Sequence, residues 1–79
     1  MDVSRLTRPL HPMPVDVQAR LEAEGLMERY RARPAYQQND YLGWIGRAVR
    51  PQTREKRLQQ MIAELQDGHL YMGMQYHAR

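Results

Sequence analysis

The sequence predicts an all-α fold: a small, compact bundle of about four short helices with flexible termini. Apolar residues recur at i, i+3, i+4 and i+7 along two neighbouring stretches, which is the spacing of one helix face. Proline and glycine stand where such stretches begin and end. No stretch alternates apolar and polar residues as a half-buried strand does.

Composition narrows the class of protein. The 79 residues are enough for one domain, and the absence of cysteine rules out disulfides and thiol chemistry. No apolar run approaches the roughly 20 residues of a membrane span. The first residues are too polar for a secretory leader. We therefore expect a cytoplasmic protein without a membrane span.

The chain divides into three parts. Residues 1–13 contain Pro9 and Pro12 and show no helical period, so we expect a flexible N-terminal arm. The helical domain is expected over residues 14–68. Residues 69–79 have apolar side chains without a clear period, and we expect a tail that is partly packed or mobile.

Two short helices are expected at the start of the domain. The first begins at Pro14 and ends at Gly25, because Val17 and Leu21 are four residues apart and glycine favours a helix end. The second is expected over residues 26–32, where apolar residues are followed by arginines that cover its outer face.

The third helix is expected over residues 34–49. Proline suits its first position, and apolar residues follow at helical spacing. Arg50 precedes a proline and should leave the helical conformation, which separates this helix from the next.

The fourth helix has the strongest pattern and is expected over residues 51–67. Pro51 suits the first turn, where its missing N–H costs nothing. Gly68 follows the last apolar residue and suits a left-handed C-cap. The apolar positions of the helices together predict a core of Leu21, Tyr30, Tyr41, Trp44, Ile45, Ala48, Leu58, Met61, Ile62 and Leu65.

The densest group of basic residues lies at the junction of the third and fourth helices. Eleven of the twelve basic residues are arginine, which suits fixed pairing and phosphate contacts. One interpretation is structural: Arg54 lies on the apolar face and pairs with Asp40, Tyr41 or Trp44. The other is an anion or nucleic-acid site near a helix start. Its candidate residues are Arg47, Arg50, Arg54 and Arg57.

No pattern of catalytic or metal-binding residues is present in the sequence. His11, His69 and His77 lie outside the expected helices and lack the close spacing of metal ligands. Gly43 and Gly46 fall within a helix, so they form no phosphate loop and are expected to permit close packing. We expect no enzyme, no cofactor and no metal.

A set of spaced residues in the third and fourth helices carries a resemblance: Tyr41, Leu42, Trp44, Ile45, Ala48, Arg50, Thr53, Arg54, Arg57, Leu58, Leu65 and Gly68. The pattern resembles the helical domain of the YdeI/OmpD-associated (bacteriocin-protection) family over about residues 14–68. Val49 and Gln52 depart from it, because the family usually has lysine and often glutamate there. The resemblance implies an all-α fold and a link to bacterial stress or envelope protection, without a reaction.

The sequence thus leaves two functional hypotheses. The first is a non-enzymatic interaction domain with an unknown protein partner. The alternative is a nucleic-acid- or phosphate-binding module that uses the basic residues between Arg47 and Arg57. Phosphate binding weakens steeply as salt rises, which separates the two. The oligomeric state does not follow from the sequence.

Overall fold

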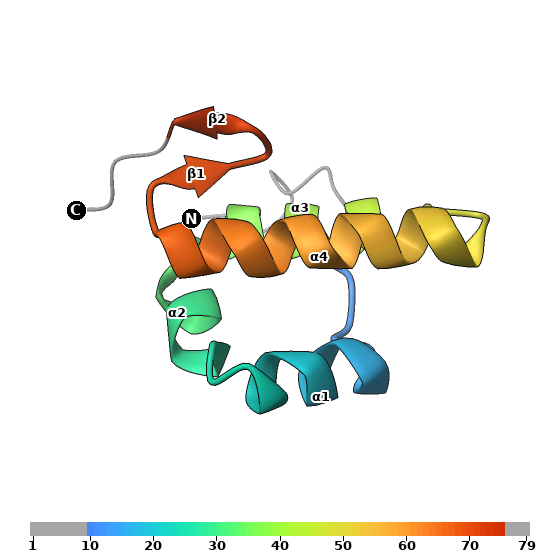
Figure 1. The fold of residues 1–79 in the computed structure, drawn as a ribbon, viewed down its shortest axis with the longest axis horizontal. Coiled ribbons are helices and arrows are strands. Elements are labelled where there is room, and N and C mark those ends of the chain that lie inside the picture. Colours follow the sequence, from blue (N-terminus) through green and yellow to red (C-terminus); the bar gives the residue numbers. More distant parts are fainter. Residues whose placement is uncertain (1–9, 76–79) are drawn as a thin grey trace.

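The computed structural model describes residues 10–75, which form four helices and a two-stranded hairpin. The helices are α1 (Val15–Ala23), α2 (Met27–Ala32), α3 (Ala35–Gly46) and α4 (Pro51–Asp67), and the strands are β1 (Leu70–Tyr71) and β2 (Met74–Gln75). Figure 1 shows α4 at the centre, with α3 antiparallel to it, α1 and α2 on one side and the hairpin on the other. Within residues 10–75, no helix is both long and apolar enough to cross a membrane.

Helix α4 has the bounds that the sequence predicts. Pro51 is its first residue, and Arg50 before it is extended, with φ −92° and ψ 141°. Gly68 ends the helix in the left-handed conformation at φ 85°, and its N–H donates to the carbonyl of Glu64 at 2.9 Å. Proline and glycine therefore fix where this helix begins and ends through their backbone geometry.

Helix α3 is shorter than expected and ends at Gly46. The chain must turn and become extended before it can enter Pro51, so residues 48–50 are not helical. Ala48, which the sequence placed in the core, is consequently half-buried, and Val49 is 95% exposed.

The core lies where α4 meets the other three helices. Its buried apolar residues are Val17, Leu21, Leu26, Tyr30, Tyr41, Leu42, Ile45, Leu58, Met61, Ile62 and Leu65. Trp44 was expected among them but is only half-buried. It packs at the edge of the core, since its helix turn faces the hairpin as well as α4.

The hairpin is the element that the sequence patterns did not predict. Each strand has two residues, and Tyr71 pairs with Met74 across a two-residue turn. Met72 and Gly73 both have positive φ, 52° and 79°, as a type I′ turn requires. The expected tail is therefore packed through its first part, while residues 76–79 lie outside the described residues.

The end of the expected N-terminal arm contacts α3. The His11 N–H donates to Asn39 Oδ1 at 2.7 Å, and Met13 packs against the core. A Cβ on Gly43 would meet the His11 ring at 2.7 Å, so this glycine makes room for the ring. The packing role expected for Gly46 is wrong, because no described atom outside its own helix backbone and chain neighbours lies within 4 Å of its ideal Cβ. Residues 1–9 of the arm lie outside the described residues.

Gly46→Ala should stabilise the domain by about 0.5–1 kcal/mol, because alanine restricts the unfolded chain and favours the helix. The new methyl group has open space around it. For a domain of this size the melting temperature should rise by a few degrees, which a thermal melt by circular dichroism would measure. Gly68→Ala is the matched control and should lower it, since φ is +85° there. A lower melting temperature for Gly46→Ala would contradict this account of the helix end.

Candidate functional site

The four candidate arginines do not form one group of free charges. Arg54 turns toward α1 and donates to Asp16 through both Nη atoms. Arg57 turns toward α3, donates to the carbonyl of Trp44 at 2.7 Å and lies 5.3 Å from the centre of its ring. Arg47 and Arg50 are exposed.

The partner of Arg54 differs from the three that the sequence suggested. Its side chain is 30% exposed and that of Asp16 is 60% exposed, so the pair lies at the surface. An exposed ion pair of this kind contributes at most about 1 kcal/mol. The hydrogen bond from Arg54 is the main cause that lowers the pKa of Asp16. Arg54 therefore joins α1 to α4 and is not a buried ion.

A similar bridge connects the next turn of α1 to α4. Arg20 Nη2 donates to Glu55 Oε2 at 2.8 Å, and this bond is the main cause that lowers the pKa of Glu55. Both bridges use residues of the first turns of α4, so they orient α1 against the end of the helix where the basic residues are concentrated.

A groove lies between α3 and the hairpin and has a volume of about 530 Å³. Three of its lining residues are spaced at i, i+4 and i+7 along α3 and its C-cap residue Arg47, which places them on one helix face. The others come from the turn and strands of the hairpin. We call it the α3–hairpin groove, and its residues are Asp40, Trp44, Arg47, Tyr71, Met72 and Met74.

The groove combines apolar side chains with one carboxylate and one guanidinium among its lining residues. Asp40 Oδ2 accepts a hydrogen bond from Tyr71 Oη at 2.6 Å, so this carboxylate already has a partner. The Tyr71 ring meets the rings of Tyr36 and Tyr41 edge to face, with centroids 6.0 Å and 5.4 Å away. No hydrogen bond or ion pair joins the Arg47 side chain to another described residue. The groove therefore holds one carboxylate that already accepts a hydrogen bond and one guanidinium whose donors have no partner among the described residues.

Glu64 fixes the hairpin wall of the groove. This residue of α4 is 3% exposed. Its carboxylate accepts hydrogen bonds from Tyr41 Oη and from Gln60 Nε2, the latter at 3.0 Å. The same carboxylate accepts the backbone N–H groups of Met72 at 2.9 Å and Gly73 at 2.8 Å. Two consecutive N–H groups of the turn thus point at one buried anion, as in an anion-binding nest.

The phenol that meets this carboxylate stays protonated. Burial is the main cause that raises the pKa of Tyr41 well above its usual range, and the hydrogen bond to Glu64 raises it further. Tyr41 therefore remains a hydrogen-bond donor at any physiological pH. Neither sequence spacing nor composition indicated this role for Glu64, because its partners lie on three different elements.

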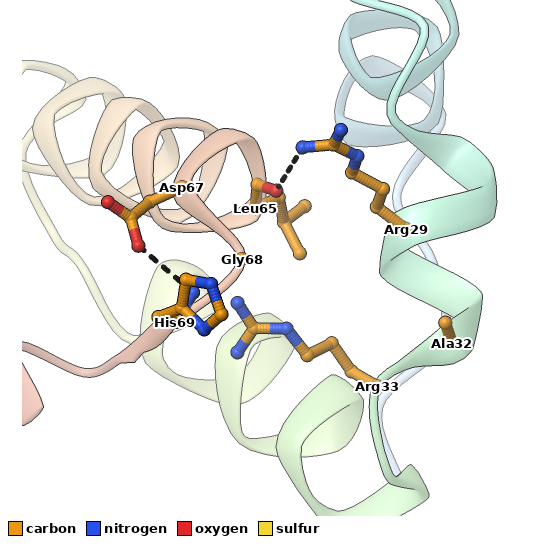
Figure 2. Close-up of a pocket in the computed structure, with 7 residues that line it drawn as sticks. All are labelled: Arg29, Ala32, Arg33, Leu65, Asp67, Gly68 and His69. Carbon is orange, nitrogen blue, oxygen red and sulfur yellow. Dashed lines mark hydrogen bonds between the residues drawn. The ribbon is translucent and has the colours of Figure 1, made fainter. Parts of the chain in front are cut away.

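A second pocket, of about 300 Å³, lies at the carboxyl end of α4. Figure 2 shows the guanidinium groups of Arg29, on α2, and of Arg33, the residue that follows α2, reaching toward this helix end. Arg29 Nη1 donates to the carbonyls of Leu65 and Gln66, at 3.2 Å and 2.7 Å, and Arg33 Nη2 donates to that of Glu64 at 3.1 Å. The carbonyls of Leu65 and Gln66 are acceptors that a helix end leaves free, whereas that of Glu64 also accepts the N–H of Gly68. We interpret this pocket as a helix cap.

Metal-ligating residues are dispersed. Among residues 10–75, no three His, Asp or Glu side chains are placed together as ligands of a metal ion. His11 lies against α3, and His69 lies beside the cap pocket. The third candidate, His77, lies outside the described residues.

Residues 11–68 match the family model OmdA, described as bacteriocin-protection, YdeI or OmpD-associated. The chain belongs to this family. The match contains all four helices and ends at Gly68, so the α3 wall of the groove lies inside it and the hairpin wall lies beyond it. Comparison with curated proteins finds no match, and neither does comparison with solved structures.

Glu64→Gln should loosen the hairpin of this OmdA-family domain. Glutamine keeps one acceptor oxygen but places an NH₂ group where the turn or Tyr41 donates. We expect a loss of about 1.5–3 kcal/mol in the free energy of unfolding, typical of hydrogen bonds to a charged group. Urea unfolding would measure it, and hydrogen exchange at Met72 and Gly73 should accelerate.

Glu28→Gln is the matched control, because it makes the same chemical change on the exposed face of α2. Its free energy of unfolding should stay within about 0.5 kcal/mol of the parent's. Unchanged exchange at Met72 and Gly73 in Glu64→Gln would contradict the role of this carboxylate in holding the turn.

The Asp16–Arg54 pair should give the domain part of its acid sensitivity. The folded pKa of Asp16 lies below its unfolded value of 3.8, so the contribution is present above that pH. It is lost as the pH falls through the lowered folded value. In low salt at pH 6 the parent should be more stable than Asp16→Asn by under about 1 kcal/mol in the free energy of unfolding. Thermal melts at pH 6 and pH 2 should show that this difference disappears at pH 2. At pH 6 it should also become smaller in 1 M NaCl.

Proposed function

We propose that this chain is a non-enzymatic protein-binding domain and that the α3–hairpin groove is its binding surface. The observation that carries the proposal is the groove's combination of side chains. Trp44 and Met72 are half-buried, and Met74 is 60% exposed beside the unpaired Arg47. Tryptophan, methionine and arginine are enriched where proteins bind one another, and methionine adapts its shape to a partner.

The family description supports a role through a partner. It names bacteriocin protection and association with OmpD. We propose that this domain likewise acts by association, in bacterial stress or envelope protection. The partner would contact α3, whose residues belong to the matched range, together with the hairpin that follows it.

Binding accounts for the ionisable groups better than catalysis does. A catalytic carboxylate needs access to a substrate. Glu64 is buried, and its carboxylate accepts hydrogen bonds from the hairpin and from two side chains. Asp16 and Glu55 are bonded to arginines at the surface. These groups support the fold, which favours a domain that works through its surface.

Phosphate or nucleic-acid binding is the second candidate. Arg47, Arg50 and Lys56 are exposed near the junction of α3 and α4, without bonds to other described side chains. If all three contacted phosphates, the logarithm of the affinity would fall by about 2–3 per tenfold increase in salt. Apolar docking in the groove would show a much smaller slope.

The test is capture of partners from lysate of the native host, with the parent chain and two variants as bait. Met74→Glu places a charge in the groove. Val49→Glu is the matched control, because it makes a similar change at an exposed residue outside the groove, at the α3–α4 junction. We expect a protein captured by the parent and by Val49→Glu but not by Met74→Glu, with or without nuclease treatment.

Other outcomes would contradict the proposal that the groove is the binding surface. Equal capture by Met74→Glu would place the binding surface elsewhere. Loss of capture after nuclease treatment, together with a steep salt dependence, would establish the phosphate-binding candidate instead. Thermal melts should give both variants a free energy of unfolding within about 0.5 kcal/mol of the parent's, since exposed positions tolerate substitution.

A further inference from the structure

We infer that the α3–hairpin groove binds a short peptide segment that carries an acidic side chain within three residues of a large apolar one. The inference rests on the proposed function, which makes the groove a protein-binding surface, and it adds the chemistry of the partner. Three features of the groove support it: the charges of its residues, the spacing of Asp40 and Arg47, and its apolar wall.

The charge of the groove favours an acidic ligand. The one carboxylate among its described lining residues, Asp40, accepts a hydrogen bond from Tyr71 Oη, a neutral donor that leaves its charge in place. The one cation of the lining, Arg47, has no hydrogen-bond or ion-pair partner for its side chain among the described residues. Arg57 adds a second positive charge beside the groove, 5.3 Å from the centre of the Trp44 ring, so two cations stand against one carboxylate. A carboxylate of the ligand can therefore pair with Arg47, and the planar guanidinium can hold it through two parallel hydrogen bonds.

The spacing along α3 sets the length of the segment. Asp40 and Arg47 are seven residues apart in the sequence, which is about 10 Å along a helix. An extended peptide covers that distance in about three residues. Trp44 lies between the two charges, so an apolar side chain that contacts it stands within three residues of the acidic side chain at Arg47.

The apolar wall indicates how selective the groove is. Trp44 on one side faces the hairpin residues Met72 and Met74 on the other. Thioether side chains have three rotatable bonds and repack around ligands of different shape. The groove should therefore accept leucine, methionine and phenylalanine with similar affinity, while the acidic residue gives most of the discrimination.

A nucleic acid fits the same groove less well. Its phosphates repeat along the strand, so one of them would approach the carboxylate of Asp40. Base stacking needs an open aromatic face, whereas the Arg57 guanidinium lies over the Trp44 ring. A peptide can place its single negative charge at the Arg47 end and leave the Asp40 end uncharged.

Selection of a phage-displayed library of random decapeptides on the full chain tests the inference. Enriched peptides should carry Asp or Glu within three residues of Leu, Met, Phe or Trp. Arg47→Glu should weaken synthetic versions of these peptides at least tenfold. Selection on Arg47→Glu should instead enrich Lys or Arg at the same position. Binding would be followed by the fluorescence of Trp44, the only tryptophan.

Arg31→Glu is the matched control, because it makes the same charge change at an exposed residue of α2, outside the groove. It should leave the selected peptides and their affinities unchanged. Thermal melts should show that both variants remain folded, since both residues are exposed and the Arg47 side chain has no hydrogen bond to another described residue.

Three results would overturn the inference. One is enrichment of peptides without an acidic residue, or of none at all. Another is a selected peptide whose affinity is the same for Arg47→Glu and the parent. The third is that a random 12-nucleotide DNA strand binds more tightly than any peptide and that this binding depends on Arg47. If capture from lysate still depended on Met74 in these cases, the proposed function would stand and only the chemistry of its partner would be wrong.

Discussion

The buried carboxylate of Glu64 is the constraint on which the arrangement of this domain depends. A buried charge is costly unless its hydrogen-bonding capacity is filled. Here α3 supplies Tyr41, α4 supplies Gln60 and the hairpin turn supplies two backbone N–H groups. Four donors from three elements meet at one anion, so none of these elements can shift without leaving the carboxylate unsatisfied.

The same residue links the hairpin turn to the cap at the carboxyl end of α4. Its side chain holds the turn that contains Met72, one of the residues lining the α3–hairpin groove. Its backbone carbonyl accepts a hydrogen bond from Arg33, which caps the carboxyl end of α4. The positive φ of Met72 is unusual for a residue other than glycine, asparagine or aspartate. The carboxylate stabilises that conformation by accepting the N–H groups on both sides of the bend.

The family match covers one wall of the groove and not the other. It spans the four helices and therefore includes Trp44 on α3 and Arg47 at its C-cap. The opposite wall, with Met72 and Met74, follows the matched range. The binding surface that we propose thus combines a wall from the family's helical domain with a hairpin wall that follows it.

The number of helices, the bounds of α4, its glycine cap and most of the core could be predicted from the sequence, because helix periodicity and backbone preferences act within a few residues. The pairing of Arg54 with Asp16, the half-buried position of Trp44 and the hairpin became evident in the folded structure. Those outcomes depend on side chains that meet across helices. Glu64 is the clearest case: its hydrogen bond to Tyr41 spans 23 residues, a separation over which no local pattern selects a partner.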